Sequence, residues 1–184
     1  MGTLTLILGG ARSGKSAWAE RTARAEGGDH VLFVATAQAL DEEMRERIAR
    51  HRTTRPSSWR TLEVHRHVGP AVRQAYNGER VIIVDCLTLL VSNIFMDIPD
   101  DPHKAREAAL EEADALIATA RVLPAHTLIV SNEVGMGIVP ATRLGRVYRD
   151  VLGEVNRHMA AMADNVYFLI AGIPMVVKGE NPSG

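Results

Sequence analysis

Residues 9–16 read Gly-Gly-Ala-Arg-Ser-Gly-Lys-Ser and match G-x-x-x-x-G-K-[ST], the pattern of a phosphate-binding loop. In such a loop, glycines let backbone N–H groups turn inward and hold phosphate oxygens, while the following helix N-terminus adds positive potential. We expect Lys15 to reach the β- and γ-phosphates of a nucleoside triphosphate and Ser16 to hold Mg²⁺. The motif predicts nucleotide binding, but it does not specify the reaction.

The residues on either side supply the structural context that this motif requires. Leu4–Leu8 is a short apolar run closed by two glycines, which is how a buried strand ends. Ala17–Glu26 contains no helix breaker before Gly27 and Gly28. Because a strand precedes the loop and a helix follows it, a chance glycine- and serine-rich turn is a poor explanation of the pattern.

Asp85 directly follows Val81–Val84, a run of four β-branched residues typical of a buried strand. A carboxylate at such a strand end, near a phosphate-binding loop, can bind Mg²⁺ directly or through water. The alternative is that Asp85 caps the next helix. We favour the metal role because nucleotide-bound Mg²⁺ needs a protein partner. Cys86 is interpreted as a small buried residue rather than a reactive thiol.

His51 lies at the end of a predicted helix, Leu40–Arg52, among the basic residues Arg50, Arg52 and Arg55. Nearby cations lower the pKa of a histidine and favour its neutral, nucleophilic form, and they also bind phosphate. A neutral imidazole beside nucleotide phosphates can attack phosphorus. The alternative is a packing role, because His51 continues an apolar stripe formed by Leu40, Met44 and Ile48.

Other polar residues stand at predicted strand ends. Residues 35–37, Ala-Thr-Ala, follow a buried strand where ligands bind in open α/β sheets, although they are equally well a small-residue strand exit. Glu63 and Glu133 are candidates to bind a metal, a ribose hydroxyl or a guanine edge. From the pattern alone, a solvated surface charge is the better interpretation of both. The histidines other than His51 show no metal-ligand spacing.

Strands alternate with helices along the chain, which predicts an α/β fold with a mostly parallel sheet covered on both faces. The predicted strands cover residues 4–8, 31–36, 59–64, 81–85, 127–130 and 166–170. The predicted helices cover residues 17–26, 40–52, 68–76, 87–95, 104–122 and 142–162. We expect five or six strands in one domain spanning residues 1–184, with a polar, frayed tail from Lys178 onward.

Composition narrows the function classes. The 184 residues carry a net charge of −1, so duplex nucleic acid and membrane surfaces are disfavoured partners. One cysteine rules out an intrachain disulfide and argues against a cysteine-based metal site, which indicates a reducing compartment. No signal-type N-terminus and no apolar run of about 18–20 residues occur, so we expect a cytoplasmic protein without a membrane span.

The motifs together resemble one family along nearly the whole chain: the bifunctional adenosylcobinamide kinase / adenosylcobinamide-phosphate guanylyltransferases of cobalamin biosynthesis. The runs that carry the resemblance are residues 9–16, 35–37, 41–44, 47–48, 51–52, 55–56, 59–60, 85–88 and 132–140. The last of these, Asn-Glu-Val-Gly-Met-Gly-Ile-Val-Pro, is long and unusual for phosphate-binding-loop proteins.

The resemblance implies a RecA-like P-loop NTPase fold, assembled as a propeller-shaped homotrimer. It implies that ATP or GTP phosphorylates the aminopropanol arm of adenosylcobinamide, and that GMP from GTP is then transferred to that phosphate. It also implies that His51 carries GMP covalently. Some relatives have a second histidine where this chain has Arg50, so His51 is the only candidate in the motif.

The resemblance also implies a set of site residues. The expected catalytic residues are His51 and Lys15. The expected Mg²⁺ ligands are Ser16 and Asp85, and some relatives have glutamate at the position of Asp85. The expected nucleotide contacts are Gly9, Gly10, Ala11, Arg12, Ser13, Gly14, Lys15, Ser16, Ala35, Thr36, Ala37, Arg52, Thr53, Thr54, Arg55, Glu63 and Asp85. Two rival functions remain: a small-molecule kinase without nucleotidyl transfer, and a nucleotide-gated binding module or ATPase.

Overall fold

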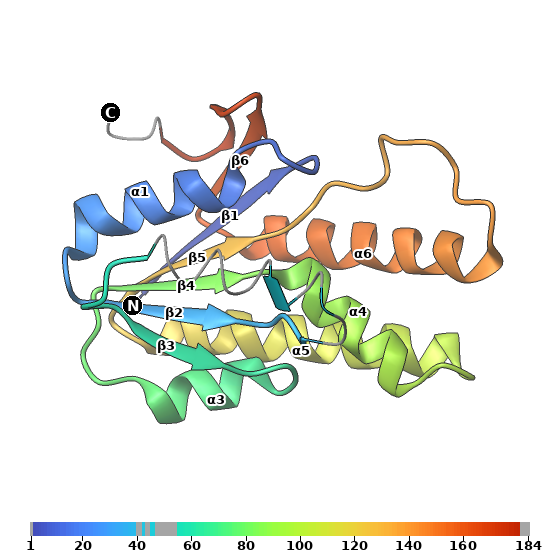
Figure 1. Ribbon diagram of the computed structural model, residues 1–184, viewed down its shortest axis with the longest axis horizontal. Helices are drawn as coiled ribbons and strands as arrows, with labels where there is room; N and C mark the ends of the chain where they lie inside the picture. Colours follow the sequence, from blue (N-terminus) through green and yellow to red (C-terminus); the bar gives the residue numbers. More distant parts are fainter. Residues whose placement is uncertain (1, 40–41, 43–44, 47–54, 181–184) are drawn as a thin grey trace.

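The structure, a computed structural model, describes residues 2–39, 42, 45–46 and 55–180. Its centre is a seven-stranded sheet in the order β3-β2-β4-β5-β1-β6-β7, in which only β7 runs antiparallel to its neighbour (Figure 1). The strands are β1 Thr3–Gly9, β2 Val31–Ala35, β3 Arg60–Glu63, β4 Val81–Asp85, β5 His126–Val130, β6 Asn165–Ile170 and β7 Ile173–Lys178.

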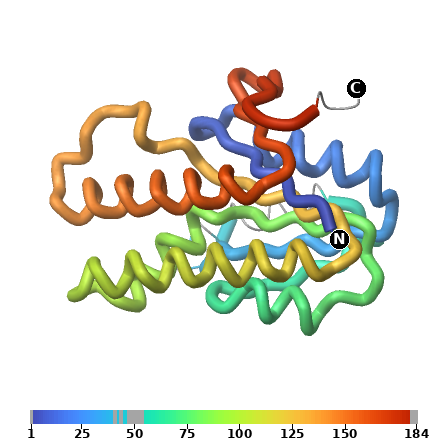
Figure 2. The backbone as a smooth tube through the Cα atoms, turned by 180° about the vertical axis from the view of Figure 1, so that it is seen from behind, coloured from blue at the N-terminus to red at the C-terminus, as the bar shows by residue number. Residues whose placement is uncertain are grey.

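Helices cover both faces of the sheet, as predicted. They are α1 Lys15–Gly27, α3 Val68–Ala75, α4 Leu87–Asp97, α5 Pro102–Val122 and α6 Arg143–Met162. Side chains alternate along each strand, so Ile83 packs with α1 on one face, while Ile82 and Val84 pack with the other helices on the opposite face. Figure 2, seen from behind, shows α5 and α6 side by side on that second face.

The prediction of five or six strands is wrong at the C-terminal end, and the predicted frayed tail is wrong for residues 178–180, whereas residues 181–184 lie outside the described residues. β7 is a seventh strand, joined to β6 by a tight turn in which Ala171 and Gly172 both have positive φ. Pro174 is tolerated because β7 lies at the sheet edge. Lys178 is also fixed, since its ammonium donates hydrogen bonds to the carbonyls of Ala161 and Ala163 at the end of α6.

Two further points concern helices. α5 begins at Pro102 rather than Lys104, because the Asp101 carboxylate accepts a hydrogen bond from the Lys104 N–H at 3.1 Å and caps the helix. Most of the predicted helix 40–52 lies outside the described residues, and its described positions, Glu42, Arg45 and Glu46, are helical. In the part of the chain that the structure describes, no helix is both long and apolar enough to cross a membrane.

Candidate nucleotide site

The carboxyl ends of the parallel strands meet at one edge of the sheet and bring the predicted site residues together. Asp85 at the end of β4 pairs with Ala35 of β2 on one side and with Val130 of β5 on the other. Val130 in turn pairs with Ile7 of β1, two residues before the phosphate-binding loop begins. Asp85 is therefore two strands from β1, or roughly 10 Å at ordinary strand spacing.

The loop between β1 and α1 has the backbone geometry of a phosphate cradle. Gly14, at the N-cap of α1, has φ of 92°, and a Cβ there would lie 3.1 Å from the Cα of Gly172. A Cβ at Gly9 would lie 2.6 Å from the carbonyl oxygen of Leu169. Both positions therefore require glycine, because the loop turns sharply against the β6–β7 hairpin. The Gly172 N–H also donates to the Ser13 carbonyl at 2.8 Å.

Lys15 is buried, and its ammonium lies over the loop rather than in open solvent. Its Nζ donates to the Gly10 carbonyl at 2.6 Å and contacts the Ser13 hydroxyl at 3.4 Å. The hydrogen bond to the Gly10 carbonyl therefore ties the Lys15 side chain back to the loop at the N-terminus of α1. This arrangement concentrates positive charge and N–H groups at one point, which suits the phosphates of a nucleotide.

Asp85 is half-buried, and it lies one residue before the N-cap of α4. The N-cap residue of α4 is Cys86, which does not support the alternative that Asp85 caps this helix. Cys86 is buried, as predicted, and burial followed by the negative charge of Asp85 raises the pKa of its thiol to about 12. The thiol is therefore protonated at neutral pH, in agreement with a packing role.

Thr36 has a structural task at this edge. Its side chain is fully buried, and its hydroxyl donates to the Cys86 carbonyl and accepts from the Cys86 N–H, both at 2.8 Å. The Asn93 amide donates to the Thr36 carbonyl at 2.9 Å. Thr36 therefore fixes the backbone immediately after Asp85, and its hydroxyl is already committed to that backbone.

We predict that Thr36→Val lowers the free energy of unfolding by about 1–3 kcal/mol, because two buried backbone groups of Cys86 lose their partner. Thr127→Val is the matched control. Thr127 is also buried on a strand, but its hydroxyl has no hydrogen-bond partner among the described residues. Its replacement is expected to be neutral or stabilising. Equal chemical-denaturation midpoints for both variants would contradict the assigned role of Thr36.

Arg55, in the segment that precedes β3, contacts the sheet at the neighbouring strand β2. Its guanidinium carbon lies 3.3 Å from the centroid of the Phe33 ring, and Phe33 is fully buried on the α1 face of the sheet. This cation–π contact holds Arg55 over β2. His51, Arg52, Thr53 and Thr54, the other predicted residues of this segment, lie outside the described residues.

Glu20 was missed by the sequence analysis. It lies on α1, one turn beyond Ser16, and it is half-buried. Burial raises the pKa of its carboxyl, and the negative charge of Asp85 raises this pKa further, against the positive charges of Arg55 and Arg24. Glu20, Asp85 and Arg55 therefore share one electrostatic environment between α1 and the sheet. The four-residue spacing from Ser16 was the only sequence signal for this placement.

Glu63 lies farther from the loop than the other predicted residues. It ends β3 and pairs with Ala35, so three strands separate it from β1. That separation corresponds to roughly 19 Å across the sheet edge. The loop and Ser16 thus stand at one end of the candidate site and Glu63 at the other, with residues 35–37 and Asp85 between them.

A buried polar network supports the exit of β5, and sequence reasoning did not find it. The Ser131 hydroxyl donates to the Asn156 side chain at 2.7 Å, and the Asn132 N–H donates to the Thr88 hydroxyl at 2.7 Å. The Asn156 amide and the Tyr148 hydroxyl bond the carbonyls of Asn132 and Thr88. Helices α4 and α6 therefore fix the residues that leave the sheet beside the phosphate-binding loop.

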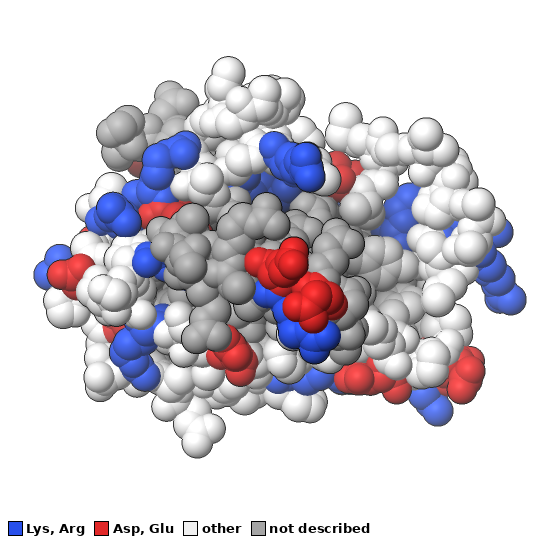
Figure 3. Space-filling model, viewed as in Figure 1, with Lys and Arg blue, Asp and Glu red and all other residues white. Residues whose placement is uncertain are grey.

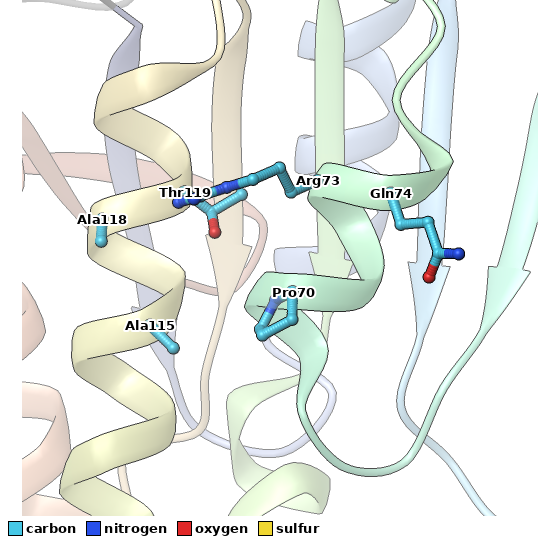
Figure 4. Close-up of a pocket in the computed structure, with 6 residues that line it drawn as sticks. All are labelled: Pro70, Arg73, Gln74, Ala115, Ala118 and Thr119. Carbon is cyan, nitrogen blue, oxygen red and sulfur yellow. The ribbon is translucent and has the colours of Figure 1, made fainter.

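A separate shallow pocket of about 340 Å³ lies between α3 and α5 (Figure 4). Its lining residues are Pro70, Arg73, Gln74, Ala115, Ala118 and Thr119. Both helices pack on the face of the sheet opposite α1, and no predicted site residue lines the pocket. The candidate nucleotide site is therefore the strand edge rather than this pocket.

Comparison with known proteins identifies relatives that match over most of their length. The sequence model of the family described as cobinamide kinase / cobinamide phosphate guanyltransferase matches residues 5–177. A protein of Escherichia coli K12, named bifunctional adenosylcobalamin biosynthesis protein CobU, is 41% identical over 182 residues, covering 95% of this chain and 99% of that protein. The Pseudomonas aeruginosa protein of this kind, named CobP, is 45% identical over 175 residues, covering 95% and 97%.

Solved structures show the same fold at low sequence identity. One of them, an ATPase domain, aligns with a TM-score of 0.55 and 12% identity, covering 98% of this chain and 78% of that one. The flagellar accessory protein FlaH of Methanocaldococcus jannaschii aligns with a TM-score of 0.51 and 13% identity, covering 97% and 79%. The predicted α/β P-loop NTPase fold is confirmed.

Proposed function

The chain belongs to the cobinamide kinase / cobinamide phosphate guanyltransferase family, and we propose that it catalyses both reactions of that name. ATP or GTP phosphorylates adenosylcobinamide, and GMP from GTP is then transferred to the new phosphate to give adenosylcobinamide-GDP. The observation that carries this proposal is the match over 95% of the chain to relatives named as bifunctional, together with an intact phosphate cradle.

The kinase step moves the γ-phosphoryl group to the hydroxyl of the acceptor. Backbone N–H groups of residues 10–16 hold the phosphates, and Lys15 neutralises the charge that develops on the β- and γ-oxygens. Lys15 already lies over the loop through its bond to the Gly10 carbonyl, so little reorganisation is needed when nucleotide binds. The chain therefore supplies positioning and charge rather than a protein nucleophile in this step.

The residues at the sheet edge fit a magnesium ion. Ser16 and Asp85 supply hydroxyl and carboxylate oxygens, the ligand types that Mg²⁺ prefers, and both side chains are half-buried. Bound Mg²⁺ would neutralise phosphate charge.

Asp85→Asn keeps the size of the side chain and removes its charge. We predict that the Mg²⁺ concentration for half-maximal activity rises by at least the roughly 10–100-fold typical of a lost metal-site partner, while the melting temperature changes little. Mg²⁺ titrations of both reactions would measure this. Asp100→Asn, in the exposed bend before α5, is the control. An unchanged magnesium requirement in Asp85→Asn would remove Asp85 from the metal site.

The guanylyl step uses a different phosphorus atom. We propose that the neutral imidazole of His51 attacks the α-phosphorus of GTP, forming a phosphorus–nitrogen bond while the bond to pyrophosphate breaks. The phosphate of adenosylcobinamide phosphate then displaces the imidazole and takes GMP. Arg55, held over Phe33 and close in sequence to His51, supports the proposal because its guanidinium is the kind of group that pairs with phosphate.

The assembly and location follow the family resemblance. We propose a homotrimer in the cytoplasm, and sedimentation analysis would measure the mass of the assembly. Incubation with α-labelled and then γ-labelled GTP is the experiment that tests the function as a whole. Formation of adenosylcobinamide-GDP carrying the α-label supports it. Nucleotide hydrolysis without a phosphorylated corrinoid would favour an ATPase, and phosphorylation alone would favour a simple kinase.

A further inference from the structure

The segment between β5 and α6, residues 131–142, is anchored to the phosphate-binding loop at its beginning. The Glu133 N–H donates to the carbonyl of Gly9 at 3.0 Å, at the end of β1. The Glu133 carboxylate accepts hydrogen bonds from the N–H groups of Gly135 and Met136, the latter at 3.1 Å. Glu133 therefore shapes the first turn of this segment from a position next to Gly9.

The other end of the segment is fixed as well. The Thr142 hydroxyl accepts from the Gly145 N–H at 3.1 Å and caps α6. The Arg146 guanidinium donates to the carbonyls of Pro140 and Ala141 at 3.0 and 2.9 Å. The segment is thus held from both sides, and its middle is carried out into solvent at the upper right of Figure 1.

The middle of the segment is apolar and almost fully exposed. Met136 is 82% exposed, Ile138 is 97% exposed and Val139 is 62% exposed. The same region is a white, uncharged surface in Figure 3. Three large apolar side chains within four residues, on a segment held at both ends, form a patch rather than scattered surface residues, and such patches mark binding sites.

The strand order places the start of this segment beside the proposed site of phosphoryl transfer. β5 lies between β4, which ends in Asp85, and β1, which leads into the phosphate-binding loop. Residues that leave β5 therefore emerge between the proposed metal ligand and the phosphate cradle, where a phosphoryl acceptor has to approach. The hydrogen bond from Glu133 to Gly9 fixes the start of the segment at that point, three residues before the patch begins.

We propose that Met136, Ile138 and Val139 form the surface on which the corrin ring of the acceptor binds. This inference rests on the proposed function. A corrin ring is a broad macrocycle that carries methyl groups between its amide side chains, so its methyl-bearing parts can contact several exposed aliphatic side chains at once. Its aminopropanol arm would then extend toward the phosphate cradle, while the nucleotide is held by the loop and does not contact the patch.

Equilibrium dialysis of adenosylcobinamide, with nucleotide binding measured in parallel, tests the proposal. Ile138→Ser is expected to raise the Kd for the corrinoid about tenfold, since one aliphatic side chain is no longer buried on binding. Val139→Ser should give a smaller rise, and the Kd for GTP should not change in either variant. Val122→Ser is the matched control, because Val122 is 65% exposed and ends α5 at the opposite edge of the sheet.

Three results would overturn the proposal: an unchanged corrinoid Kd in Ile138→Ser, an equal loss in Val122→Ser, or a loss accompanied by dissociation of the assembly in sedimentation. The last result would assign the patch to contacts between copies of the chain. A wild-type protein that binds adenosylcobinamide without phosphorylating it would contradict the proposed function, whereas the comparison of Kd values would still decide the role of the patch.

Discussion

Lys15→Ala is expected to lower both the kinase and the guanylyltransferase rate by roughly 10²–10³-fold, the loss typical of one preorganised electrostatic donor. The reason is that both reactions use one triphosphate cradle. The Lys15 ammonium lies over the loop, 2.6 Å from the Gly10 carbonyl, and the other lysines, Lys104 and Lys178, belong to α5 and β7. Initial rates with adenosylcobinamide and with adenosylcobinamide phosphate would measure the two effects separately.

The control for Lys15 is Lys104→Ala, which removes an exposed lysine at the start of α5. It should leave both rates unchanged. Thermal unfolding of Lys15→Ala checks that the loop still folds, because the substitution also removes a hydrogen bond to Gly10. A variant that loses only one activity while keeping the other at the wild-type rate would show that the two reactions use separate nucleotide sites.

The phosphate cradle was predictable because everything that forms it is local in the sequence. A buried strand, a glycine-spaced turn and a helix follow one another within residues 3–27, and each has its own pattern. The other central strands were found for the same reason, since their apolar runs are bounded by turn residues. Because these strands run parallel, their carboxyl ends lie at the same edge of the sheet.

β7 was not predicted because its stability comes from a partner strand rather than from its own pattern. Residues 173–177 are all apolar and include Pro174, so they lack the alternation of apolar and polar residues that marks a half-buried strand. The turn that forms the hairpin uses Ala171 with φ of 51°, whereas the usual sequence signal is asparagine or aspartate before glycine. Pairing with β6 outweighs both local disadvantages.

The contacts that complete the site join residues far apart in the chain. Thr36 bonds the backbone of Cys86, Arg55 covers Phe33, and Glu20 shares its surroundings with Asp85. None of these pairs has a characteristic spacing, so local patterns could not reveal them. Thr36 was expected to contact nucleotide, and the structure adds a backbone-positioning role that depends on the order β2-β4 in the sheet.

His51 is expected to serve guanylyl transfer but not the kinase step, so it distinguishes the two reactions. This role remains a prediction because His51 lies outside the described residues. If His51 is the nucleophile, label from the α-phosphate of GTP should remain on the protein, and label from the γ-phosphate should not. A phosphorus–nitrogen bond is hydrolysed in acid and survives alkali, so the adduct should be acid-labile and alkali-stable. Adding adenosylcobinamide phosphate should remove it.

His51→Asn should abolish both the adduct and guanylyl transfer, while the kinase rate stays near that of the wild type. The kinase step survives because the acceptor hydroxyl attacks directly and needs no protein nucleophile. Asparagine keeps a polar side chain at this position, so a packing role alone would leave guanylyl transfer largely intact. His30→Asn, an exposed histidine just before β2, is the control and should retain both activities. An adduct that still forms on His51→Asn would place the nucleophile elsewhere in the chain.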